Sequence, residues 1–190
     1  MTRNVLTALA VAGVLLGVPA PAQAQEDYEA GSVDNYALSL GLGLVDPEGA
    51  TEPYYAAALR IRLGDHDRSR EDLRDEGIHG YIEPEVGYWS RDSANQDLLV
   101  GANLIGVVPF RRVDYTFGVG AGVHFLDFTL RDRDLVIEES DEALGVNAQF
   151  GIDVHLSEST ALFGVGRIDL VEGDVHELQN KVYLGARFFF

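Results

Sequence analysis

Hydrophobic residues occupy every second position along most of the chain beyond residue 35. In the clearest run, the odd positions from Val113 to Phe125 are Val, Ala or aromatic, and the even positions between them are Asp, Thr, Gly or His. Successive side chains of a β-strand point to opposite faces, so this period of two predicts strands with one apolar face; helical periodicity is hard to find. The alternation predicts eight strands: Tyr36–Leu44, Tyr55–Leu63, Ile82–Trp89, Asp97–Leu104, Val113–Phe125, Leu144–Val154, Thr160–Leu170 and Val182–Phe190.

The chemistry of the two strand faces indicates what surrounds the barrel. One face carries Leu, Val, Ile, Phe and Ala, with tyrosines near strand ends, and the other carries mostly Gly, Ser, Ala and Asn with occasional charges. A soluble barrel such as a lipocalin turns its apolar face inward, whereas an outer-membrane barrel turns it to lipid. Small residues suit the narrow interior of eight strands. We therefore expect an all-β fold, an eight-stranded antiparallel up-and-down transmembrane β-barrel.

The first residues have the pattern of a cleaved export signal. Arg3 precedes a short apolar run from Val5 to Val18, and the small residues Ala22 and Ala24 mark a cleavage site after Ala24. The run is shorter than the roughly 18 apolar residues that a membrane helix needs. We expect residues 1–24 to be a secretory signal peptide, 25–33 a flexible amino-terminal segment and 34–190 a barrel in the bacterial outer membrane.

Composition excludes several classes of protein. The chain has 14 basic and 31 acidic residues, which gives a formal net charge of −17. Proteins bind nucleic acids by replacing the counterions of the phosphates with Lys and Arg side chains, so we expect no nucleic-acid partner for so acidic a chain. With no cysteine, it cannot form a disulfide, a zinc–thiolate site or an iron–sulfur cluster. Asp65 to Glu76 is spaced nearly like a calcium loop, but Arg70 stands where that loop requires glycine. We expect no metal site and no cofactor.

The carboxy terminus carries a separate signal. Lys181–Phe190 alternates and ends in Phe188, Phe189 and Phe190, and this ending resembles the signature by which the bacterial assembly machinery recognises outer-membrane proteins. With the export signal and eight strands, the chain resembles small eight-stranded outer-membrane β-barrel proteins, among them the transmembrane domain of outer-membrane protein A, small adhesin-like barrels and lipid A deacylases. The resemblance implies outer-membrane lipid, lipopolysaccharide, the assembly machinery and periplasmic chaperones as partners, and Phe188 and Phe190 as the assembly signal.

The resemblance also suggests where a catalytic site would lie. Lipid A deacylases carry a lipid-facing His-x-Ser near the end of the seventh strand, but the matching stretch here, Val165–Leu170, contains neither residue. Nucleophile activation needs a base within hydrogen-bond reach, so we expect no catalytic residues.

Gly118, Gly120 and Gly122 lie inside a strand, where a tight lumen explains them better than a nucleotide loop does. We expect a non-enzymatic barrel with a structural, barrier or surface-interaction role; the alternatives are a lipid-modifying hydrolase and a small channel for hydrophobic solutes.

Charged residues on the inward face form the remaining candidate site. Eight are expected in the lumen: Arg60, Arg62, Glu83, Glu85, Asp97, Asp114, Asp153 and Arg187. Isolated charges in a narrow interior are costly, so they should pair, and a structural plug is favoured over a proton or ion path. If the connection between the second and third strands is centred between Glu71 and Asp72, Arg60 lies opposite Glu83. Arg62 and Glu85 are then diagonal neighbours, and the four form one charge cluster.

Two long connections and the seventh strand are the remaining parts of the predicted barrel. Gly64–His79 and Asp127–Glu142 are long, charged and predicted to be loops, with the second outside the cell by strand counting from a periplasmic amino terminus. The seventh strand is ambiguous in register, and a bulge is predicted at Gly164–Gly166.

Overall fold

The structure is a computed structural model, and it describes residues 35–46, 51–64, 77–92, 95–132, 135–172 and 178–190. Eight strands run through these segments: β1 (Tyr36–Asp46), β2 (Glu52–Arg62), β3 (His79–Asp92), β4 (Asn95–Phe110), β5 (Val113–Asp132), β6 (Leu135–Ser157), β7 (Thr160–Val171) and β8 (Leu178–Phe189). The eight predicted strands are therefore confirmed. The signal-peptide prediction, with Ala22 and Ala24, lies outside the described residues and stays a prediction.

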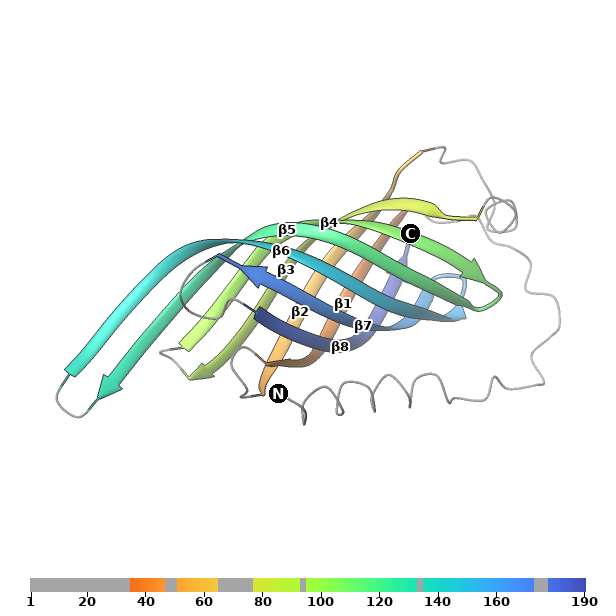
Figure 1. Ribbon diagram of the computed structural model, residues 1–190. Coiled ribbons are helices and arrows are strands. Elements are labelled where there is room, and N and C mark those ends of the chain that lie inside the picture. The colour runs from red at the N-terminus through yellow and green to blue at the C-terminus, as the bar shows by residue number, and fades with distance from the viewer. Residues whose placement is uncertain (1–34, 47–50, 65–76, 93–94, 133–134, 173–177) are drawn as a thin grey trace.

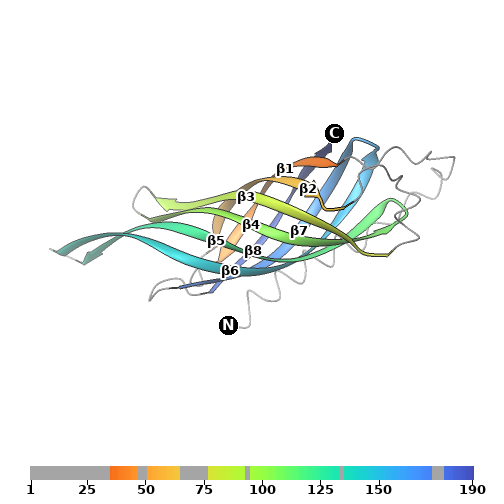
Figure 2. The same cartoon turned by 90° about the horizontal axis from the view of Figure 1, so that it is seen from above.

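The strands form one closed antiparallel barrel in chain order (Figures 1 and 2). Closure comes from β1 and β8, which pair from Ala37–Phe189 to Asp46–Asn180. The predicted fold class is confirmed. Because closure pairs every strand on both sides, the backbone groups of the wall are satisfied without solvent. In the described segments, no helix is long and apolar enough to span a membrane.

The two ends of the barrel differ. At one end, two-residue turns at 111–112 and 158–159 join β4 to β5 and β6 to β7, and β8 finishes beside them; we call this the turn end. At the opposite end, β5 and β6 project well beyond the other strands (Figure 1), and we call this the hairpin end.

The prediction that Asp127–Glu142 is a loop is wrong. The β4 ladder ends at Asn95–Phe128 and the β7 ladder at Gly145–Val171, but β5 and β6 continue to pair as far as Asp132–Leu135. A strand that leaves the barrel wall need not keep one face apolar, so the period-two signal disappears while the backbone ladder continues. Polarity alone therefore gave a misleading boundary.

The predicted bulge in β7 is also wrong. β7 pairs with β8 without interruption from Thr160–Phe188 to Leu170–Leu178, and the register shift on its other side lies between His155 and Ser157, beside the turn. Gly164 and Gly166 point outward in an otherwise regular strand, where the missing side chains conceal the alternation. With this register, Arg167 and Asp169 face the lumen.

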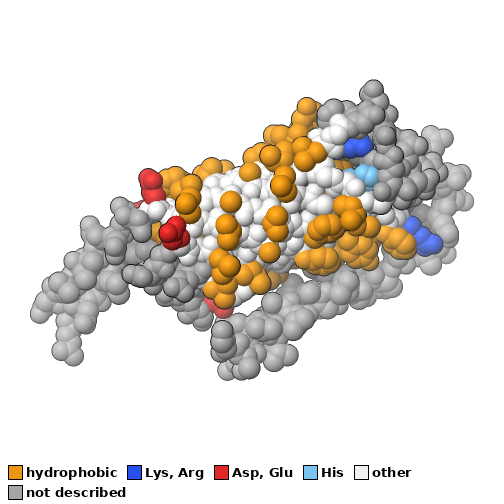
Figure 3. Space-filling view, turned by 45° about the horizontal axis from the view of Figure 1, so that its top comes forward, with side chains coloured by type: hydrophobic (Ala, Val, Ile, Leu, Met, Phe, Trp, Pro, Cys, Tyr) orange, Lys and Arg blue, Asp and Glu red, His pale blue; other side chains and the backbone are white. Residues whose placement is uncertain are grey.

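The outer face of the barrel is apolar. More than half of the surface is exposed for each of Leu42, Leu44, Val119 and Phe150. Figure 3 shows hydrophobic side chains across the middle of the molecule, with charged side chains toward its ends. Exposed apolar area on this scale is unusual for a soluble monomer and is the pattern of a lipid-facing wall.

Glycines on the inner face make room for side chains that cross the lumen. A Cβ atom on Gly145 would lie 2.6 Å from His124 Nε2, and one on Gly120 would lie 2.7 Å from Asn147 Nδ2. A Cβ atom forms no hydrogen bond and is essentially never found this close to another heavy atom, so a larger residue would displace these polar side chains. The interpretation of the Gly118, Gly120 and Gly122 run as lumen-facing residues therefore agrees with their surroundings.

Candidate functional site

The interior of the barrel contains an unusual amount of charge. Among the buried residues are Arg60, Arg62, Glu83, Glu85, Asp97, Asp114, Asp153, Arg167, Asp169, Lys181 and Arg187. A charge removed from water without a partner is strongly destabilising, so the wall can tolerate these groups only if they neutralise one another. Eight of them do so in two ionic networks, and a third, hydrogen-bonded network surrounds Asp97. Asp114 contacts His155 instead, and Arg62 belongs to none of the three networks.

The first network, the four-charge ring, lies toward the turn end. Arg60 Nε donates to Glu83 Oε2 at 2.8 Å, and Arg60 Nη1 donates to Asp153 Oδ2 at 3.0 Å. Arg187 donates to the same Asp153 carboxylate and lies 3.6 Å from Glu83 Oε2. Two cations and two anions therefore alternate, and the ring is neutral as a whole.

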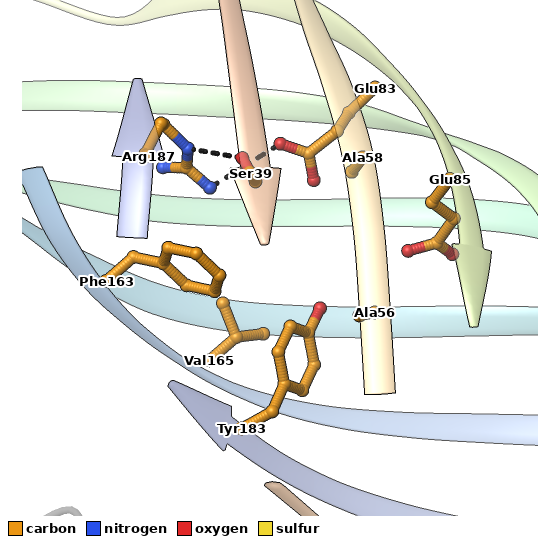
Figure 4. A pocket seen from close by; sticks show the side chains of 9 residues that line it. All are labelled: Ser39, Ala56, Ala58, Glu83, Glu85, Phe163, Val165, Tyr183 and Arg187. Atoms are coloured by element: carbon orange, nitrogen blue, oxygen red, sulfur yellow. Dashed lines mark hydrogen bonds and ion pairs between the residues drawn. The ribbon is translucent and has the colours of Figure 1, made fainter. Parts of the chain in front are cut away.

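Neighbouring side chains hold the ring in place. Arg187 Nε donates to Ser39 Oγ at 2.8 Å, a bond visible in Figure 4, and the Arg187 guanidinium lies 4.9 Å from the Phe163 ring centroid. The Arg60 guanidinium lies 5.7 Å from the Tyr81 ring. Aromatic faces attract cations, and this attraction is strongest where water is excluded.

The second network lies nearer the hairpin end. Arg167 binds Glu85, and Arg167 Nη2 donates to Asp169 Oδ1 at 2.6 Å. Lys181 Nζ lies 3.2 Å from Asp169 Oδ2, as an ion pair rather than a directed hydrogen bond, and 4.9 Å from the Tyr54 ring. This network also contains two cations and two anions.

The third network is centred on one carboxylate oxygen. Asp97 Oδ2 accepts hydrogen bonds from Trp89 Nε1 at 3.2 Å and Gln179 Nε2 at 3.0 Å, and His124 Nδ1 lies 2.8 Å away. All four side chains are at most 1% exposed. Several hydrogen bonds to one oxygen stabilise its negative charge in a dry interior.

Each network joins opposite walls of the barrel. Strands four apart in an eight-stranded barrel face one another, and the cross-lumen contacts are Arg60–Asp153 from β2 to β6, Arg167–Glu85 from β7 to β3, and Gln179–Asp97 from β8 to β4. Between the first two networks, Phe163, Val165 and Tyr183 pack in an apolar layer. The cavity there, drawn in Figure 4, has room for about one water molecule.

The cluster predicted from the sequence is partly present. Arg60 and Glu83 pair as predicted, since β2 and β3 adopt the expected register with Tyr54 opposite Trp89. Glu85, however, binds Arg167 instead of joining Arg60, and Arg62 has a buried Nη1 with no hydrogen-bond partner in the described part of the chain. The four residues therefore do not form one cluster. The tilt of the strands brings Glu85 to the same height in the lumen as Arg167 of β7, and the separation of the two residues in the sequence does not show this.

Three lumen charges were missing from the sequence prediction: Arg167, Asp169 and Lys181. Gly164 and Gly166 concealed the inward register of the first two. Lys181 alternates in register with Tyr183 and Arg187, so the pattern of β8 already contained the signal for it.

The histidine and serine at the end of β6 are not arranged as a catalytic pair. A His-x-Ser triplet does occur at the end of β6, but His155 is buried in the lumen with its Nε2 2.7 Å from Asp114 Oδ2, whereas Ser157 is exposed and its Oγ lies 3.5 Å from Ser159 Oγ. In the described segments, no group of three or more His, Cys, Asp or Glu side chains is arranged to hold a metal ion.

Comparison of the sequence with known proteins finds no relative. No protein-family model matches the chain, and no curated protein matches its sequence.

Comparison of the fold finds several bacterial barrels. Neisserial surface protein A aligns with a TM-score of 0.57 at 10% identity, covering 82% of this chain and 96% of that one. Ail, the attachment invasion locus protein of Yersinia pestis, aligns with 0.51 at 10% identity, covering 82% and 96%. The outer membrane enzyme PagL aligns with 0.50 at 12% identity, covering 81% and 99%. At these identities the likeness establishes the fold.

Proposed function

We propose that the chain is a non-conducting, non-enzymatic integral barrel of the bacterial outer membrane with a structural, barrier or surface-interaction role. The observation that carries the proposal is the inversion of the two faces. Inside lie neutralised charges such as Arg187 and Asp153, and outside lie exposed leucines, valines and aromatics. A soluble barrel would gain nothing from this arrangement, whereas a bilayer requires it.

A barrier role is supported by the cross-lumen networks. An ion entering the lumen would have to separate the four-charge ring and then pass the apolar layer at Phe163 and Val165. Separating one buried partner from another typically costs about 3–5 kcal/mol. The interior therefore acts as a plug.

The absence of catalysis is supported by the lipid-facing side of β7. The outward positions corresponding to a deacylase site are Gly166, Ile168 and Leu170, and the last two are about half exposed. None of the three can act as a nucleophile or as a base.

The hairpin end supports a role at the cell surface. With the turn end in the periplasm, the β5–β6 ribbon extends away from the membrane, and Asp127–Glu142 carries seven acidic residues against two arginines. Such a segment repels anionic lipopolysaccharide unless divalent cations lie between them, so we propose that this contact depends on magnesium or calcium.

Two measurements on the folded protein test the proposal. Unboiled and boiled samples should migrate differently on a denaturing gel, because a closed barrel resists detergent until heated. The same preparation in planar bilayers should give no steady single-channel current. Identical migration together with recovery in the soluble periplasmic fraction would refute the membrane location, and steady conductance would refute the plug. Release of fatty acid from lipid A would refute the non-enzymatic role.

A further inference from the structure

One part of the barrel wall is paired less completely than the rest. We call the line along which β2 and β3 pair the β2–β3 seam. Pairing there stops after Ala58–Glu85 and resumes at Ile61–Ile82, with the same register on both sides. In the described segments, the other seven ladders run through the wall without interruption, and register shifts occur only beside the connections between strands. The β2–β3 ladder is also the shortest of the eight.

Pro84 explains the interruption. The register places it opposite Leu59, in the middle of β3, and proline has no amide hydrogen. The Leu63 amide donates to the Gly80 carbonyl oxygen at 2.9 Å, and hydrogen-bonded pairs of an antiparallel ladder recur at every second residue. Leu59 and Pro84 therefore occupy a hydrogen-bonded position, at which Pro84 cannot donate to the Leu59 carbonyl oxygen. Proline is rarely found inside a strand that is paired on both sides.

The interruption lies on the part of the wall that faces lipid. Leu59 is 36% exposed and Val86 is 46% exposed, and Pro84 is also exposed on the outer face. Hydrocarbon chains offer no hydrogen-bond donor in place of the missing amide, and an unsatisfied backbone group in lipid is strongly unfavourable. The backbone therefore joins β2 to β3 less strongly at this point than it joins the strands of the neighbouring ladders.

An ion pair crosses the seam at the same point on the inner face. Arg60 and Glu83 occupy the other interrupted position of the ladder, and Arg60 Nε lies 2.8 Å from Glu83 Oε2. The other two members of the four-charge ring, Asp153 and Arg187, belong to β6 and β8. The Arg60–Glu83 pair is therefore the contact of the ring that joins the two strands of the seam directly.

A small space lies immediately behind the seam. The cavity next to the four-charge ring is lined on this side by Ala56 and Ala58 of β2 and by Glu83 and Glu85 of β3 (Figure 4). Because alanine side chains are short, β2 covers the cavity with little more than its backbone. Separation of β2 from β3 at this point would therefore connect the cavity with the bilayer.

We propose that β2 and β3 separate locally at Leu59 and Pro84 and admit small uncharged molecules from the bilayer to the cavity, with the Arg60–Glu83 ion pair as the latch that keeps the seam closed. This inference rests on the proposed membrane location, because only a lipid-facing seam gives access from the bilayer. The apolar layer at Phe163 and Val165 stays in place, so the opening gives lateral access without a path through the lumen.

Amide hydrogen exchange of the full barrel, refolded in lipid nanodiscs, measures the opening. The amides of Ile61 and Ile82 are the seam reporters, and those of Ala148 and Ile168, paired between β6 and β7, are the opposite-wall reporters. In the wild type, the seam reporters should exchange faster than the opposite-wall reporters by about 10-fold or more, because local opening exposes them without unfolding the barrel.

Pro84→Ala tests the cause of the opening. Alanine supplies the missing amide hydrogen, so exchange of the seam reporters should become slower by about 5- to 100-fold, the factor that corresponds to satisfying one buried polar group. Pro109→Ala is the matched control, because Pro109 also lies in a strand but pairs with Asp114 beside the β4–β5 turn. It should leave the seam reporters unchanged.

Glu83→Gln tests the latch. It keeps the shape of the side chain and removes its charge, so exchange at the seam should become faster relative to the opposite wall by about 5- to 30-fold, since charge-assisted hydrogen bonds are roughly twice as strong as neutral ones. The matched control is Glu85→Gln, which removes the same charge from the same strand, but from a carboxylate whose partner Arg167 lies on β7. It should leave the ratio of the two sets of reporters unchanged.

A single thiol tests access from the bilayer. The chain has no cysteine, so Ala58→Cys introduces one reactive group at the cavity. A maleimide dissolved in the bilayer should label it, and Pro84→Ala should slow this labelling by about the same factor as the amide exchange. A charged thiol reagent that does not enter membranes should label it much more slowly.

Several outcomes would overturn the inference: equal exchange at both sets of reporters in the wild type, unchanged seam exchange in Pro84→Ala, equal effects of Glu83→Gln and Glu85→Gln, or faster labelling by the charged reagent. Heat-independent gel migration would refute the proposed membrane location and this inference with it. A heat-modifiable barrel whose seam exchanges as slowly as the opposite wall would refute only the inference.

Discussion

Removing Glu83 should unbalance the four-charge ring. In the ring, Glu83 lies 2.8 Å from Arg60 and 3.6 Å from Arg187. At an effective dielectric constant of about 20, these distances correspond to attractions of about 6 and 5 kcal/mol, which the desolvation of the carboxylate and its repulsion from Asp153 largely offset. Glu83→Ala leaves two cations against one anion and should destabilise the barrel by about 3–5 kcal/mol.

A second substitution should restore the balance. Arg60→Ala together with Glu83→Ala leaves Arg187 paired with Asp153, so one cation again faces one anion. The double variant should therefore be more stable than the sum of the two single effects predicts, with a coupling energy of about 2–3 kcal/mol. As a matched control, Arg60→Ala with Asp97→Asn combines residues from different networks and should be additive within about 0.5 kcal/mol.

Urea unfolding of the barrel in lipid vesicles measures these differences. Trp89 is the only tryptophan in the chain and is 1% exposed in the lumen, so its fluorescence reports opening of the interior without an added label. A coupling energy near zero for Arg60 and Glu83 would show that water screens the ring, and the plug would then have to be abandoned in favour of a hydrated path.

Further substitutions and accessibility measurements test other parts of the structure. A Cβ atom on Gly120 would lie 2.7 Å from a backbone oxygen of β4, so Gly120→Ala should destabilise the barrel by about 1–3 kcal/mol; Gly80→Ala, whose nearest neighbour is 3.8 Å away, should change urea stability by less than about 0.5 kcal/mol. Deleting Phe190 or replacing it with Asp should lower the outer-membrane level several-fold without changing export, and equal levels after membrane fractionation would mean that the aromatic ending is incidental. On intact cells, trypsin should cut within Asp127–Glu142 and spare Gly64–His79, and the reverse pattern would invert the barrel.

Much of the barrel can be predicted from the sequence, because the relevant signals are local. Side chains alternate from one strand face to the other with a period of two, so the run from Val113 to Phe125 is enough to assign its inner and outer faces. The register of β2 and β3 is also a local property, because the two strands are consecutive in the chain and pair directly. Centring their connection between Glu71 and Asp72 placed Arg60 opposite Glu83 correctly. Where the local signal weakens, the prediction fails: glycines in β7 concealed Arg167, and the β5–β6 ribbon loses its alternation outside the wall.

The pairing across the lumen was decided by the tertiary structure alone. The sequence shows that Glu85 faces inward, but its partner Arg167 lies on the opposite wall, and the tilt and stagger of all eight strands determine which residues stand at the same height. The same geometry brings Asp153 to Arg60 and Gln179 to Asp97. Alternation therefore determines which charges enter the barrel, and closure determines which of them meet, because an interior contact depends on every strand between its two partners.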